Sequence, residues 1–188
     1  EEFDCTLTGM DRKNYDEEKM FEALLKHIQS AIQAMVKNVL KENKQVLAKV
    51  YGRQVKKLVY AAKNNFLRIN YIEAIKLLNK NGFKKLKFGD DLKANHEQTV
   101  VRLLNRGNSE QPVFITRYPK EIKFFNMKVS RRDPQVVLSA DLIFPYSGEA
   151  TGSAVREHEF DKLKLRLLTS TMYKLHRQRG GKLADFRW

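Results

Sequence analysis

The amino-acid sequence predicts an α+β fold, in which an antiparallel β-sheet is flanked by helices. Apolar residues recur every three or four positions over residues 17–43, which is the period of an amphipathic helix. From residue 112 the period becomes that of strands, in short runs separated by turns. Over residues 159–178 the helical period returns, so we expect a last helix that covers the sheet.

The first helix opens a helical part that we expect to span about residues 15–107. Asp16 stands directly before it and can cap its N-terminus, and Glu17 and Glu18 suit the positive end of the helix dipole. Residues 45–64 then predict one or two further short helices.

The second half of the helical part begins with a short strand at residues 66–69. Asn70 is expected to cap the next helix, which ends where Asn81 and Gly82 allow a left-handed turn. Another helix is expected over residues 95–106, and Gly107 would close it.

The sheet is expected over about residues 112–156. Its four strand-like runs cover residues 112–118, 123–130, 136–144 and 149–156. The turns between them are too short for parallel crossovers, so neighbouring strands should be antiparallel. Because no repeat or change in composition marks a boundary, we expect a single domain over residues 1–188.

Composition narrows the range of partners. The chain has 36 Lys and Arg against 22 Asp and Glu, a formal charge of +14, which favours a polyanion such as nucleic acid. Cys5 is the only cysteine, so an internal disulfide and cysteine-based zinc sites are excluded. No apolar run is long enough to span a membrane and the first residues do not resemble a targeting peptide, so we expect a cytoplasmic protein.

Two acidic residues stand out in the strand region. Asp141 interrupts an apolar run, where a charge is costly, and Glu149 begins the next strand. Carboxylates on adjoining strands can share a divalent cation or hold an ammonium or guanidinium group between them. The alternative is that Asp141 pairs with an internal arginine, and spacing alone does not decide between the two.

The segment from Gly148 to Arg156 is rich in small residues, which let a ligand approach the backbone, and Arg156 could hold a carboxylate or phosphate. Glu149 and Arg156 are seven positions apart, so strict alternation would point them to opposite faces. A bulge would bring them to one face, and we expect it at Gly152. No nucleophile motif is present and no metal-ligand pair involves a histidine, so the catalytic group stays unassigned.

Several strings in this order and spacing resemble one enzyme family. They are Pro112 to Met127 with its Tyr-Pro-Lys-Glu-Ile-Lys core, Ala140-Asp-Leu-Ile, Gly148-Glu149, Arg156-Glu157 and, upstream, Arg68 to Ile75, Gly89 to Leu92 and His96-Glu97. Together they resemble the catalytic domain of asparaginyl-tRNA synthetases, in the aspartate/asparagine subclass of class II. The resemblance covers residues 65–165 well and the rest loosely.

The resemblance implies an antiparallel class II sheet and a two-step ligase reaction. Asparagine and ATP would form an adenylate, and tRNA would then accept the aminoacyl group. Asp141 and Glu149 would bind the Mg²⁺ that bridges the ATP phosphates, with Ser153 beside them. Arg156 would hold the amino-acid side chain at Gly152, and Glu97 would lie near the ammonium group of the substrate. The full-length enzyme would be a homodimer, and aspartate remains open as the substrate.

The sequence also departs from the family pattern. Where the family reads Gly-Glu-Ile-Ile-Gly-Gly-Ser-Gln-Arg, Ser153 replaces the second glycine and Ala154 replaces the serine, which implies altered magnesium binding. Phe3 resembles the adenine-stacking residue after motif 2, but Leu7 and Gly9 stand where acids are expected. Motifs 1 and 3 and most of motif 2 are missing, so we expect a fragment that is inactive alone.

Two other functions fit the same strings. One is a paralogue with the same fold that no longer charges tRNA, such as an ATP-dependent asparagine synthetase or another adenylate-forming amide ligase. The other is a non-catalytic RNA-binding paralogue, which the charge of +14 and Ala154 would favour.

Overall fold

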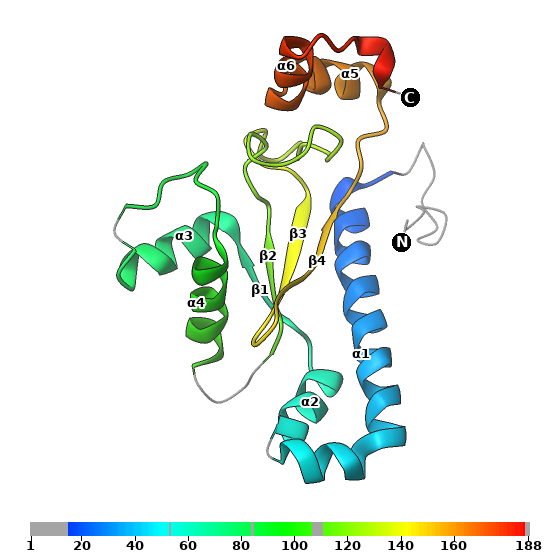
Figure 1. The fold of residues 1–188 in the computed structure, drawn as a ribbon, viewed down its shortest axis with the longest axis vertical. Coiled ribbons are helices and arrows are strands. Elements are labelled where there is room, and N and C mark those ends of the chain that lie inside the picture. Colours follow the sequence, from blue (N-terminus) through cyan, green and yellow to red (C-terminus); the bar gives the residue numbers. More distant parts are fainter. Residues whose placement is uncertain (1–14, 53, 84, 107–110, 187–188) are drawn as a thin grey trace.

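A computed structural model describes residues 15–52, 54–83, 85–106 and 111–186. The expectations for Phe3, Leu7, Gly9 and the closing Gly107 lie outside these residues. The elements follow the chain as α1 (Glu17–Tyr51), α2 (Gln54–Lys63), β1 (Leu67–Asn70), α3 (Tyr71–Lys80), α4 (Ala94–Asn105), β2 (Val113–Thr116), β3 (Ser139–Phe144), β4 (Gly148–Ala154), α5 (Phe160–Thr169), α6 (Thr171–Gln178) and a 3₁₀ turn at Leu183–Asp185. The α+β class is confirmed (Figure 1).

The sheet has the strand order β1-β2-β3-β4 and is mixed, not purely antiparallel. β2 pairs antiparallel with β3, and β3 with β4, as expected. β1 pairs parallel with β2, because α3 and α4 form the long crossover that parallel neighbours need.

The strand expected at residues 123–130 is wrong. These residues form turns, with isolated bridges from Met127 to Arg156 and from Val129 to Val137. The alternating pattern predicted a strand in which Lys128 points to solvent. In the structure Lys128 is instead buried, at 1% exposure.

Local signals at the helix ends explain where α1 and α3 begin. The Asp16 carboxylate accepts hydrogen bonds from the backbone N–H groups of Glu18 and Lys19, and the Asn70 side chain accepts one from that of Glu73. α1 continues past residue 43 because nothing interrupts it before Gly52, whose φ is +53°.

The expected single helix over residues 159–178 is wrong. Ser170 has an extended backbone, ends α5, and caps α6 by accepting a hydrogen bond from the N–H of Tyr173. The pair lies beyond the end of the sheet instead of covering it (Figure 1).

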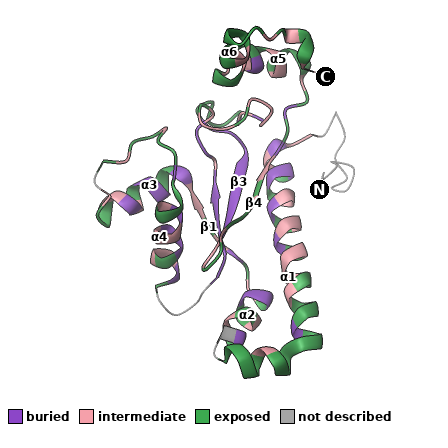
Figure 2. Ribbon diagram, in the orientation of Figure 1, coloured by how far each residue is buried: buried purple, intermediate pink, exposed green. Residues whose placement is uncertain are grey.

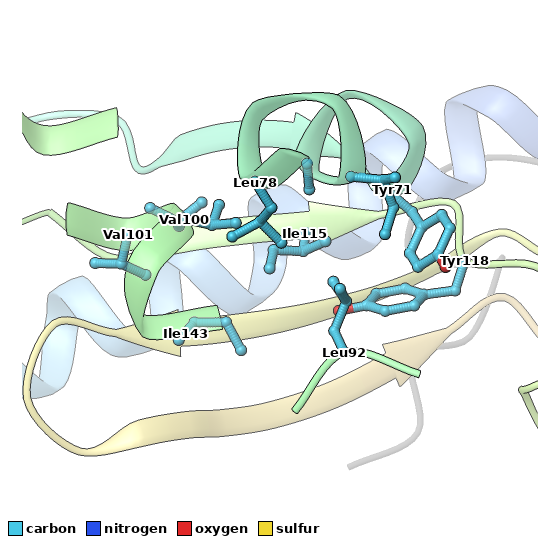
Figure 3. Close-up of a cluster of buried hydrophobic side chains, with 11 residues drawn as sticks. Tyr71, Leu78, Leu92, Val100, Val101, Ile115, Tyr118 and Ile143 are labelled. Atoms are coloured by element: carbon cyan, nitrogen blue, oxygen red, sulfur yellow. The ribbon is translucent and has the colours of Figure 1, made fainter. Parts of the chain in front are cut away.

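Each face of the sheet has its own core (Figure 2). On one face α3 and α4 pack against the sheet through a cluster that includes Ile115 and Ile143 (Figure 3). On the other face α1 packs against Phe114 and Leu142. The alternation of side chains along β2 and β3 therefore decides which residues reach which face.

Among the described helices, α1 included, none is both long and apolar enough to cross a membrane.

Candidate functional site

Asp141 and Glu149 lie on the same face of the sheet because of a β-bulge. Asp141 pairs with Gly152, and Leu142 with Thr151, but the next pair joins Ile143 to Glu149. Ala150 is therefore the extra residue on β4, and it shifts Glu149 to the face that Asp141 and Ile143 share. A bulge was expected, but its position at Gly152 is wrong, since Gly152 is in register.

The carboxylate oxygens of Asp141 and Glu149 both lie close to Gly152. A Cβ atom there would lie 3.0 Å from Glu149 Oε1 and 3.4 Å from Asp141 Oδ1. A side chain there would crowd the Glu149 carboxylate and touch that of Asp141, so glycine leaves room for both acids beside the backbone. Gly152 and Glu149 are exposed while Asp141 is buried, so this space opens to solvent on one side.

Asp141 pairs with a lysine instead of the arginine that was expected as the alternative. Lys123 Nζ lies 2.6 Å from Asp141 Oδ2 and 4.0 Å from the centroid of the Tyr118 ring. The Tyr118 hydroxyl is buried and has no hydrogen-bond partner among the described residues. Burial, followed by the charges of Asp141 and Glu97, raises its pKa, so the hydroxyl keeps its proton.

Glu97, on α4, interacts electrostatically with Asp141 and Glu149. Its side chain is buried at 9% exposure. Burial first, and then the charges of Glu149 and Asp141, raise its pKa from 4.5 to about 7. Glu97 is therefore poised to exchange a proton near neutral pH, and its expected place beside the ammonium group of a substrate stays a prediction.

Arg156 and Ser153 form no hydrogen bond or ion pair with these acids in the described part of the chain. Arg156 is exposed, and its Nη1 donates to Asn126 Oδ1 at 3.2 Å. Ser153 pairs with Ala140 and donates its hydroxyl proton to the Ala140 carbonyl at 2.9 Å, which places it on the α1 face. The structure therefore does not bring Ser153 to the acids.

The donor set near Gly152 fits a magnesium ion that a substrate helps to hold. No group of three or more His, Cys, Asp or Glu that could bind a metal occurs among the described residues. Magnesium, however, is commonly bound by one or two carboxylates together with substrate phosphates. The Asp141 and Glu149 oxygens beside Gly152 could form such a pair.

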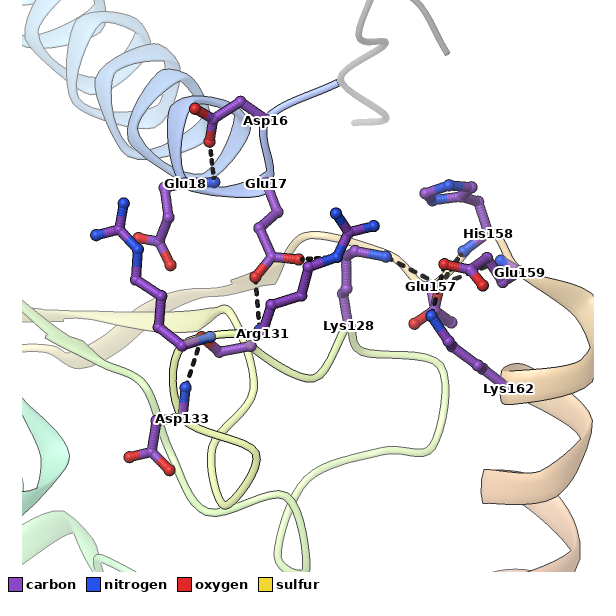
Figure 4. Close-up of polar contacts among 12 residues, drawn as sticks. Asp16, Glu17, Glu18, Lys128, Arg131, Asp133, Glu157, His158, Glu159 and Lys162 are labelled. Atoms are coloured by element: carbon purple, nitrogen blue, oxygen red, sulfur yellow. Dashed lines mark hydrogen bonds and ion pairs between the residues drawn. The ribbon is translucent and has the colours of Figure 1, made fainter. Parts of the chain in front are cut away.

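Sequence reasoning missed the lysines of the loop before β3. Lys123 gave no signal beyond its place in a resembling string. Lys128 Nζ lies 3.0 Å from Glu157 Oε1, and both side chains are almost fully buried (Figure 4). The N–H groups of His158 and Glu159 donate to the same carboxylate oxygen. A lysine within a mostly apolar run was the available signal for this pair.

Glu97→Gln is expected to stabilise the chain increasingly as the pH rises. In native Glu97 the proton is held up to about pH 7, whereas the unfolded chain releases it near 4.5. The folded state therefore binds more protons in this window, and stability falls as the pH rises through it. In metal-free buffer, thermal unfolding should favour the variant by about 1–3 kcal/mol near pH 8 and by almost nothing near pH 4. For the exposed Glu42→Gln, the stability of parent and variant should change with pH in parallel. The same parallel change for Glu97→Gln would show that Glu97 does not have a raised pKa in the folded chain.

Comparisons with known proteins identify the family of this chain. Residues 14–184 match the family model described as tRNA synthetases class II (D, K and N). The asparagine–tRNA ligase of Desulforamulus reducens is 39% identical over 148 residues, which cover 78% of this chain and 33% of that protein. The cytoplasmic asparagine–tRNA ligase of Saccharomyces cerevisiae is 34% identical over 148 residues, 76% of this chain and 25% of that protein.

A solved structure shares the arrangement of the elements. It is asparaginyl-tRNA synthetase from Pyrococcus horikoshii complexed with asparaginyl-adenylate, at 30% identity and a TM-score of 0.73. The match covers 89% of this chain and 35% of that one, so the chain spans about a third of the length of these three relatives or less. Since the family model matches nearly the whole chain, the chain belongs to the class II tRNA synthetases of the D, K and N group.

Proposed function

We propose that this chain is part of the catalytic domain of an asparagine–tRNA ligase. The observation that carries the proposal is the meeting of Asp141 and Glu149 over Gly152 on an open face, with Glu97 nearby. The relatives named asparagine–tRNA ligase, and the similarity to a structure that holds asparaginyl-adenylate, support the choice of reaction.

In the proposed reaction an asparagine carboxylate oxygen attacks the innermost phosphorus of ATP and pyrophosphate leaves. A terminal hydroxyl of tRNA then attacks the carbonyl carbon of the adenylate, and AMP leaves. Asp141 and Glu149 would hold Mg²⁺ on the ATP phosphates, where the ion supplies positive charge to balance them. Lys123 adds a second positive charge beside Asp141.

The amino acid would lie between Arg156 and Glu97. Val155 is buried in the core on the α1 side, so alternation turns Arg156 to the face of Gly152. A guanidinium there suits the side-chain amide oxygen of asparagine, and the Glu97 carboxylate suits its ammonium group. A bound ammonium would favour the charged form of Glu97 and lower its pKa from about 7.

The partners of the complete protein would be ATP, asparagine and tRNA. We also propose a cytoplasmic protein, which the name of the Saccharomyces cerevisiae relative supports. A homodimer is proposed from the resemblance alone.

Pyrophosphate exchange by the complete protein tests this function. Asparagine should support exchange far better than aspartate, as expected of a protein that is similar to asparagine–tRNA ligases. Transfer of the amino acid to tRNA should follow. Exchange with aspartate together with ammonia-dependent amide formation would instead identify an asparagine synthetase, and absence of exchange with either amino acid would contradict both enzymes.

A further inference from the structure

The distal half of the α1–α2 hairpin, residues 34–63, concentrates positive charge. Leaving residue 53 aside, this segment contains seven lysines and a single acid, Glu42. The proximal half of α1, residues 17–33, contains three glutamates and two lysines. The charge of the chain is therefore unevenly distributed, and the hairpin extends below the sheet, away from α5 and α6 (Figure 1).

Most lysines of the hairpin are not used within the described fold, but Lys57 donates a hydrogen bond to the Tyr146 hydroxyl. The proximal glutamates form ion pairs: Glu17 with Arg131, Glu18 with Arg117 and Glu22 with Arg68. By contrast, six hairpin lysines are exposed and form no ion pair with any described residue, namely Lys37, Lys41, Lys44, Lys49, Lys56 and Lys63. Their charges stay available to a partner.

Most of these lysines lie on one side of the hairpin. Lys37, Lys41 and Lys44 follow the spacing of one stripe on α1, and Lys56, Tyr60 and Lys63 that of one stripe on α2. The helices pack through Leu40, Val55 and Ala62, with Val36, Leu47 and Val59 around them.

The two stripes face the same way. At 3.6 residues per turn, each stripe lies about a quarter-turn from the packed side of its own helix. Because the chain reverses direction at Gly52, these rotations carry both stripes to one side of the hairpin. We call the surface of Lys37, Lys41, Lys44, Lys56, Tyr60 and Lys63 the basic face.

We propose that the basic face binds the sugar-phosphate backbone of RNA. Lysines four residues apart are about 6 Å apart along a helix axis, which suits a polymer with closely spaced phosphates. Tyr60 is 48% exposed between two of them and offers a ring for stacking. The choice of RNA among polyanions rests on the proposed function, while the surface rests on charge and geometry alone.

An anionic membrane fits this surface less well. Four exposed aliphatic residues of the same segment of α1 form a second stripe, namely Met35, Val39, Val46 and Val50. They lie about half a turn from the stripe of Lys37, so inserting them into lipid would turn these lysines away from the headgroups. The apolar stripe also lacks the large aromatic residues that usually anchor interfacial helices.

Binding of labelled total tRNA to the complete protein, followed by fluorescence anisotropy over a range of salt, tests the proposal. The variant Lys37→Gln/Lys41→Gln/Lys44→Gln removes three charges from the basic face. Its matched control is Lys76→Gln/Lys80→Gln/Lys87→Gln, which removes three exposed lysines near α3. The first should weaken binding roughly tenfold or more and reduce the slope of log K against log salt by about 2–3, and the control by much less.

Equal weakening in both variants, or none in the first, would overturn the proposal. So would loss of binding to phosphatidylserine-containing vesicles with tRNA binding unchanged, because the surface would then serve lipid. Pyrophosphate exchange needs no tRNA, so the hairpin variant should keep it. A protein that lacks exchange but shows the same difference in tRNA binding would refute the proposed reaction and leave the RNA surface standing.

Discussion

Glu149→Gln in the complete protein is expected to lower asparagine-dependent pyrophosphate exchange by at least about a hundredfold. Glutamine keeps the shape of the side chain but removes the negative charge that faces Asp141 over Gly152. Without that charge the site binds a phosphate-bound cation weakly, and groups that stabilise transition-state charge typically contribute factors of about 10²–10³.

The matched control for this change is Glu42→Gln, which removes an exposed carboxylate on α1. It should leave exchange unchanged, and both variants should unfold at nearly the parental temperature. Raising the magnesium concentration should recover part of the lost activity of Glu149→Gln if the defect is in cation binding. Near-normal exchange by Glu149→Gln at low magnesium would remove Glu149 from the site.

Lys128→Met is expected to destabilise the fold strongly, by about 3–5 kcal/mol. The Lys128 and Glu157 side chains are 2% and 4% exposed, so removing the ammonium leaves a carboxylate buried without its counter-charge. Because the N–H groups of His158 and Glu159 still donate to that carboxylate, the loss should lie toward the lower figure. Denaturant unfolding of the variant and parent measures it.

Lys162→Met supplies the control for Lys128→Met, because Lys162 pairs with Glu159 at the surface and should cost less than about 1 kcal/mol. Burial by itself raises the pKa of Glu157, but the Glu159 N–H and the Lys128 ammonium outweigh it, and the pKa lies below 4.5. The pair thus stabilises the fold above about pH 4.5, and the difference between parent and variant should shrink as the pH falls below that. Equal costs for both methionine variants would show that the buried pair is unimportant.

The elements that could be predicted from the sequence are those that local chemistry decides. The side chains of Asp16 and Asn70 cap α1 and α3, so the starts of both helices can be predicted from nearby residues. The strands β2 and β3 follow from apolar β-branched runs, and the turn residues from Pro145 to Gly148 separate β3 from β4. Asp141 was identifiable because a charge in such a run requires a partner.

The remaining features depend on contacts between distant segments. The bulge at Ala150 results from the way β4 pairs with β3, and no property of Ala150 itself predicts it. The parallel position of β1 depends on how α3 and α4 pack on the sheet. Lys123 reaches Asp141 from a loop 18 residues away, which alternation within a strand does not reveal.

The position of a bound metal is the most direct test of whether Asp141 and Glu149 act together on one face of the sheet. Crystals of the complete protein with Mn²⁺ and a non-hydrolysable ATP analogue would give an anomalous difference peak at the ion. We expect that peak within about 2–2.5 Å of carboxylate oxygens of both Glu149 and Asp141, above Gly152. A metal ligated by neither residue, or a Glu149 side chain on the face that packs against α1, would contradict the site.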